Sequence, residues 1–125
     1  MIAKISSSEN LAGALGYNFK KVVSGDASVL LAEGLYANPE GGYTMEEVLS
    51  DMQAAIPKKC RTKNVVFHCS LNPHPDEKLS DEQLTQIAQE YMQALGYGEQ
   101  PYIVFKHNDI EREHIHIVSL RVNSA

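Results

Sequence analysis

The last third of the chain constrains the fold most strongly, because it predicts a β-hairpin. Residues 102–107 and 114–122 are rich in β-branched and aromatic residues with period-two alternation, and a short polar connection separates them. Successive side chains on a strand project to opposite faces of its sheet, so His114 and His116 point to the same face. The hairpin brings the first strand alongside, and we expect His107 to join the other two histidines there.

The rest of the sequence alternates between strand-like and helix-like segments. Two helices open with a capping box, and the serines at 6–8 are candidate caps for the first helix. The elements expected before the hairpin are a strand at 2–5, a helix through Asn18, a strand at 27–32, a helix at 45–56, a strand at 64–71 and a helix at 81–95. This order predicts an α+β fold, with a mainly antiparallel sheet, helices packed on one face and the other face free for a site.

Size and composition favour one domain. The chain has 125 residues, of which 43% are hydrophobic, and this is enough for a single core. No stretch approaches the roughly 18 apolar residues that a membrane span needs, and the N-terminus lacks a secretion signal, so we expect a cytoplasmic protein without membrane contact. The formal net charge of −5 argues against a protein that binds long duplex DNA through its phosphates, but it does not exclude a site-specific enzyme.

Three of the five histidines lie between positions 107 and 116. Three neutral imidazoles on one sheet face suit a divalent transition metal, whereas a lone histidine is usually an ordinary surface residue. We therefore predict that His107, His114 and His116 are metal ligands, for Mg, Mn or Zn. Asp109 follows closely and is able to accept an N–H from a liganding ring, although a plain turn role explains it equally well.

The spacing of these residues also resembles a known signature. His107-x-Asp109 followed by His114-Ile115-His116 resembles the H-x-D-x-x-x-x-H-x-H motif of the relaxases, the mobilisation nucleases of plasmids and conjugative elements within the His-hydrophobic-His (HUH) endonucleases. The resemblance extends to segments along the whole chain, namely 1–5, 14–18, 67–73 and 96–98. It implies a relaxase-like catalytic domain over residues 1–125, shortened at its C-terminus because family members usually continue further.

Relaxases cut one DNA strand with a tyrosine hydroxyl and stay attached to the 5′ phosphate. The resemblance therefore implies metal-dependent nicking of single-stranded DNA at an origin of transfer in plasmid or conjugative mobilisation, together with accessory mobilisation proteins. The family places its nucleophile on the first helix, which selects Tyr17. Tyr36 and Tyr43, beside a glycine-rich loop, are the reserve candidates.

Four further residues are candidates for contact with DNA. His68 and Ser70 fall on the polar face of their predicted strand and are able to line a DNA groove, although a buried, hydrogen-bonded role explains His68 equally well. Lys106 and Arg112 flank the predicted hairpin turn and are candidate phosphate contacts, although exposed basic residues at turns are commonplace.

Two other functions remain open at this stage. A zinc hydrolase also uses three histidines, but it attacks with metal-bound water and needs no tyrosine. A non-catalytic module for single-stranded nucleic acid is the other alternative. Such modules stack bases on exposed aromatic residues, and this chain has no Trp and only three Phe.

Overall fold

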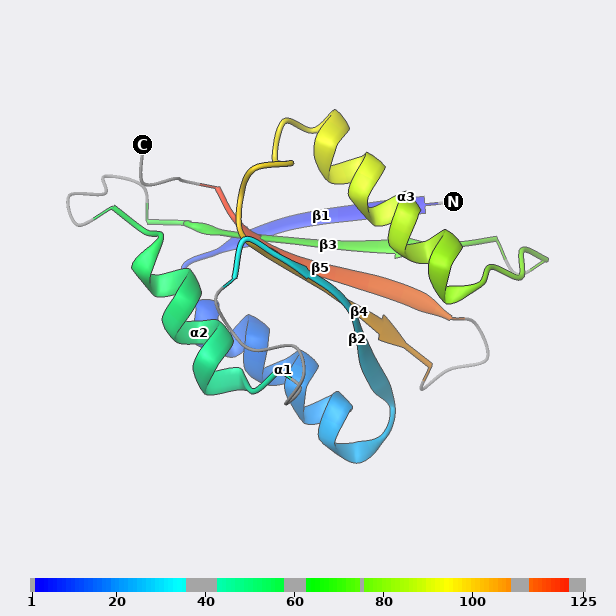
Figure 1. Cartoon of the computed structure of the whole chain (residues 1–125), viewed down its shortest axis with the longest axis horizontal. Coiled ribbons are helices and arrows are strands. Elements are labelled where there is room, and N and C mark those ends of the chain that lie inside the picture. Colours follow the sequence, from blue (N-terminus) through cyan, green and yellow to red (C-terminus); the bar gives the residue numbers. More distant parts are fainter. Residues whose placement is uncertain (1, 36–42, 58–62, 75, 109–112, 122–125) are drawn as a thin grey trace.

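The computed structural model describes residues 2–35, 43–57, 63–74, 76–108 and 113–121, which form a five-stranded sheet and three helices (Figure 1). The strand order is β1-β3-β5-β4-β2, and all four pairings are antiparallel. This confirms the α+β class. In chain order the elements are β1 (Ile2–Ser8), α1 (Leu11–Ser24), β2 (Ala27–Glu33), α2 (Met45–Ala54), β3 (Val66–Asn72), α3 (Asp81–Ala94), β4 (Tyr102–His107) and β5 (His114–Leu120).

The helices cover both faces of the sheet, and not one face as the sequence predicted (Figure 1). Helices α1 and α2 pack Leu15 and Val48 against Phe105 on one face, while α3 packs Leu84 and Met92 against the other. The physical reason is the composition of β4 and β5, which carry large apolar side chains on both faces and so need two covering layers. A functional site on that first face therefore has to lie beside α1, which covers part of the face.

The first helix begins later than predicted. The serines expected as caps belong instead to β1, which pairs with β3 through Ser8 opposite Val66. Asn10 is the N-cap, and its Oδ1 accepts a hydrogen bond from the backbone N–H of Gly13 at 2.9 Å. The predicted capping box of α3 is confirmed, since Ser80 and Gln83 exchange both of its hydrogen bonds. None of the described helices is long and apolar enough to cross a bilayer.

Strand register decides which polar side chains meet. His107 lies opposite His114, and His116 lies between Phe105 on β4 and Ser70 on β3. Directly opposed residues in an antiparallel pair share a face. The histidines, Ser70 and Phe105 therefore lie on the face that α1 and α2 cover.

Phe105 should be essential to this packing, because it is completely buried and its ring meets Phe19 of α1 edge to face at a centroid distance of 5.2 Å. We expect Phe105→Ala to lower the free energy of unfolding by about 3–5 kcal/mol in urea denaturation. Val23→Ala is the control, since Val23 lies on the same helix as Phe19 with 88% of its surface exposed. Its effect should stay within about 0.5 kcal/mol. Equal effects of the two variants would contradict the packing of α1 on β4.

Candidate metal centre and active site

Three histidines from the β4–β5 hairpin converge at one point of the sheet. One side-chain nitrogen from each of His107, His114 and His116 lies within 4.8 Å of the others. His107 is fully buried, whereas the other two are half-buried. The rings of His107 and His116 are the closest pair, with centroids 4.0 Å apart. This is the convergence that the alternation along the two strands predicts.

His107 is held by a residue of the first helix. Nε2 of its ring lies 2.7 Å from Oδ1 of Asn18, and both side chains are fully buried. The amide nitrogen of Asn18 donates to the carbonyl of Ala14 at 2.9 Å, so the amide presents its oxygen to the histidine. Nε2 therefore donates the hydrogen bond, and the neutral ring carries its lone pair on Nδ1.

His116 is held in a similar way by β3. Nε2 of His68 and Nδ1 of His116 share a hydrogen bond of 3.0 Å, and the two rings stack with centroids 5.1 Å apart. Burial lowers the pKa of His68, which favours its neutral form. Nε2 of His116 is the nitrogen that can bind a metal when Nδ1 of His116 donates this hydrogen bond to Nε2 of His68.

Tyr17 projects from α1 next to these rings. Its ring stacks on His107 with centroids 6.1 Å apart and lies 6.4 Å from that of His116. The residue is 53% exposed, so an incoming ligand can reach it. Lys21, one helical turn later, places its ammonium 5.9 Å from the centroid of the tyrosine ring.

The reserve tyrosines lie elsewhere. Tyr43 packs against the apolar cluster between the sheet and helices α1 and α2, and it lines a cavity of about 440 Å³ together with Phe19 and Met45. Tyr36 lies outside the described residues. Among the described tyrosines, ring contacts with the histidine cluster are made by Tyr17.

The remaining candidates divide between the two faces. Ser70 is half-buried beside His116. Lys106 projects to the opposite face of the sheet, where its ammonium lies 2.6 Å from Asp81 and 3.4 Å from Glu113. The hydrogen bond to Asp81 raises the pKa of Lys106 above its usual value. Lys106 is therefore engaged away from the cluster.

Two other candidates, Asp109 and Arg112, lie outside the described residues. The structure therefore gives no account of the partner expected at Asp109 or of the phosphate contact expected at Arg112.

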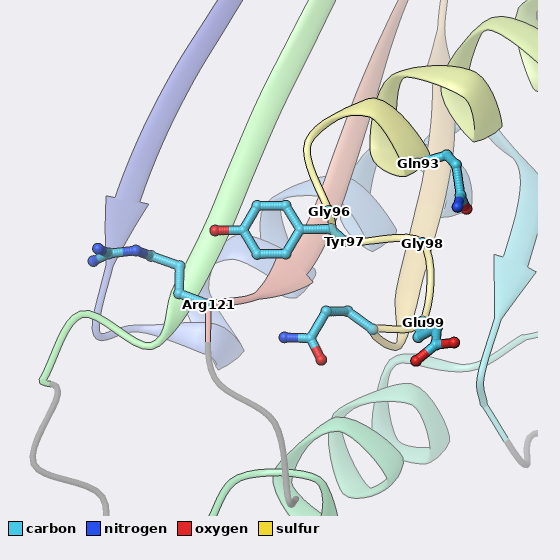
Figure 2. Close-up of a pocket in the computed structure, with 7 residues that line it drawn as sticks. Gln93, Gly96, Tyr97, Gly98, Glu99 and Arg121 are labelled. Atoms are coloured by element: carbon cyan, nitrogen blue, oxygen red, sulfur yellow. The ribbon is translucent and has the colours of Figure 1, made fainter.

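The glycine-rich turn at 96–98 is also distant from the histidines. It follows α3, and Tyr97 packs on Phe67 with ring centroids 4.9 Å apart. This turn lines a cavity of about 340 Å³ together with Gln93 and Arg121. Figure 2 shows the residues that line it. Arg121 follows the C-terminal end of β5, whereas His114 begins that strand. The cavity and the histidines therefore lie at opposite ends of β5.

A comparison with protein-family models matches residues 17–125 to the relaxase family, described as the MobA/VirD2-like nuclease domain. The chain belongs to the relaxase family. The matched region begins at Tyr17 and includes all three histidines. No curated protein and no solved structure matches the chain. Membership supports DNA nicking in mobilisation as the general activity of this relaxase, and relaxases use divalent metals.

The residues of this relaxase fit such a metal. Three imidazole nitrogens converge, and two of the rings are oriented from behind by Asn18 and His68, as liganding histidines usually are. Asn18 was not among the site residues that the sequence predicted. The available signal was a poor helix former in the middle of a helix, directly after the candidate tyrosine.

Metal binding is testable with a matched pair of histidine variants. We expect His114→Ala to weaken Zn²⁺ binding strongly in a chelator competition assay, because it removes one of three donors. His74→Ala is the control, since His74 is exposed and lies outside the cluster. Thermal melting of the metal-free proteins should give similar midpoints for both variants. Unchanged Zn²⁺ affinity in His114→Ala would contradict the site.

Proposed function

We propose that this relaxase cuts one strand of DNA at an origin of transfer, with Tyr17 as the nucleophile and a divalent ion held by His107, His114 and His116. The observation that carries the proposal is the position of Tyr17, which lies on a different element from the histidines, yet stacks on the ring of His107 and lies beside that of His116. A zinc hydrolase acting through water has no need of this tyrosine.

The chemistry is a transesterification. The Tyr17 oxygen forms a bond to the scissile phosphorus as the bond to the 3′ oxygen breaks, which leaves a 5′-phosphotyrosine and a free 3′ hydroxyl once the hydroxyl proton has moved. One phosphate ester replaces another, so the reverse reaction can rejoin the strand. A divalent ion held by neutral imidazoles keeps its full charge, and it would stabilise the negative charge that develops on the phosphate.

The residues around the cluster suit an anionic substrate. Strands β1, β3, β4 and β5, within the bounds given above, contain no Asp or Glu, although the whole chain has a net charge of −5. Ser70 lies between His116 and Lys4 in register, and Ser6 lies opposite His68. These side chains lie on the histidine face and offer hydrogen bonds to a DNA backbone. We propose that the single strand crosses β3 and β1 here.

Lys21 places its ammonium over the ring of Tyr17, the proposed nucleophile. Its ammonium would favour the negative charge of an approaching phosphate. This local charge, together with the ion, compensates for the acidic balance of the chain. The wider proposal is a cytoplasmic relaxase domain over residues 1–125 that acts in plasmid or conjugative mobilisation with accessory proteins, using Mg, Mn or Zn.

The nucleophile is tested by Tyr17→Phe. The change removes one oxygen and keeps the ring, so we expect metal binding to survive and the covalent protein–DNA adduct to disappear. The assay is denaturing electrophoresis of labelled single strands tiled across the DNA that flanks the gene, with divalent metal present. Tyr97→Phe is the matched control, because Tyr97 lies at the other end of the sheet, and it should form the adduct normally.

Other outcomes have definite meanings. An adduct that persists in Tyr17→Phe would move the assignment to Tyr36 or Tyr43. Nicking by the wild type without any adduct would favour attack by water and the three-histidine hydrolase. DNA binding with neither nicking nor adduct would favour the non-catalytic module.

A further inference from the structure

We infer that Asn18 is a positioning residue for the metal centre: it fixes the proton of His107 on Nε2 and so ties the helix that carries Tyr17 to the metal ligands. The inference rests on the proposed function, because it assigns a task to a residue that contacts neither the metal nor the phosphate. It deepens that proposal by explaining how the first helix and the hairpin hold one geometry.

The hydrogen bond is buried and its direction is fixed. Oδ1 of Asn18 lies 2.7 Å from Nε2 of His107, and both residues have no exposed surface. The amide group of Asn18 is oriented by its own hydrogen bond to Ala14 within the helix. Because Oδ1 only accepts, His107 must donate from Nε2, and an unpaired polar atom at this depth would be costly. The helix therefore selects one tautomer of the ring.

The selected tautomer matters for metal binding. A neutral imidazole can coordinate only through its unprotonated nitrogen. With the proton held on Nε2, the lone pair of His107 lies on Nδ1, and the ring belongs to the group of three whose nitrogens approach within 4.8 Å. Hydrogen bonds of this kind fix the orientation and raise the basicity of a liganding histidine.

The same bond also fixes the tyrosine. Asn18 is the residue directly after Tyr17, so a shift of α1 along the sheet would move both residues together. The 2.7 Å contact joins the helix directly to β4, and the Tyr17 ring stacks on the same histidine at an interplanar angle of 22°. Asn18 thus couples the placement of the nucleophile to that of a ligand.

Two substitutions separate acceptance of the hydrogen bond from packing. Asn18→Leu keeps the volume and removes the acceptor. Asn18→Asp keeps an acceptor oxygen for His107, while it replaces the donor to Ala14 with an oxygen and adds a buried carboxylate, a common partner of liganding histidines. Leu15→Val is the matched control for stability. Leu15 is a fully buried residue of the same helix, and its apolar side chain takes no part in the hydrogen bond to His107.

Two measurements read the result without enzyme activity. Long-range ¹H–¹⁵N NMR of the metal-free protein reports the His107 tautomer, and chelator competition reports Zn²⁺ affinity. We expect wild type, Asn18→Asp and Leu15→Val to keep the proton on Nε2. Asn18→Leu should lose this preference and bind Zn²⁺ roughly 10- to 100-fold more weakly. Asn18→Asp should bind Zn²⁺ with nearly wild-type affinity.

The inference is overturned if Asn18→Leu keeps wild-type Zn²⁺ affinity, or if Leu15→Val loses as much affinity as Asn18→Leu. Should circular dichroism show that Asn18→Leu is unfolded, Asn18→Ala replaces it with the same expected results. A wild type that binds no Zn²⁺ but shows the Nε2 proton would instead refute the metal centre, and with it any role of Asn18 in that centre. A wild type that forms no covalent adduct with DNA, with these readouts intact, would refute only the assignment of Tyr17 as the nucleophile.

Discussion

The antiparallel register between β4 and β5 is the constraint on which the rest of the site depends. It places His107 opposite His114 and Phe105 opposite His116, so three imidazoles and a core aromatic ring lie on one face. A slip of one residue would send the histidines of one strand to the other face, against α3. The register is held by the apolar side chains of both strands, which fill one core on each side of the sheet. Stability and function therefore depend on the same alternation.

Elements next to this hairpin supply a tyrosine and two hydrogen-bond partners to the histidines. Helix α1 places Tyr17 and Asn18 next to His107, and β3 places His68 alongside His116. Asn18 and His68 each engage one ring nitrogen of a histidine proposed as a metal ligand, which leaves its other nitrogen available to a metal. No Asp or Glu lies within β1, β3, β4 or β5, and Glu33 of β2 pairs with Tyr102, at the opposite end of β4 from His107. This distribution of charge favours the proposed approach of a phosphate to the histidines.

The sequence predicted the hairpin and its converging histidines because a period of two residues determines which side chains share a face. It could not determine what covers that face. The apolar stripe of each helix predicts that the helix packs on a sheet, but it does not determine on which face. The large apolar residues on both faces of β4 imply two covering layers, and α3 forms the second one. The role of His68 depends on β3 lying beside β5, and local patterns do not encode strand order. Asn18 was missed for the same reason, since its partner lies 89 positions away in the sequence.

The central claim is that one divalent ion binds among His107, His114 and His116, on the side of the sheet that Tyr17 faces. Anomalous diffraction from crystals of the wild-type protein grown with Mn²⁺ tests this most directly. We predict one strong peak within bonding distance of a nitrogen from each of the three rings, with Nδ1 as the ligand from His107 and Nε2 from His116. A well-ordered structure at saturating Mn²⁺ with no peak among these rings, or with the ion bound elsewhere, would contradict the account.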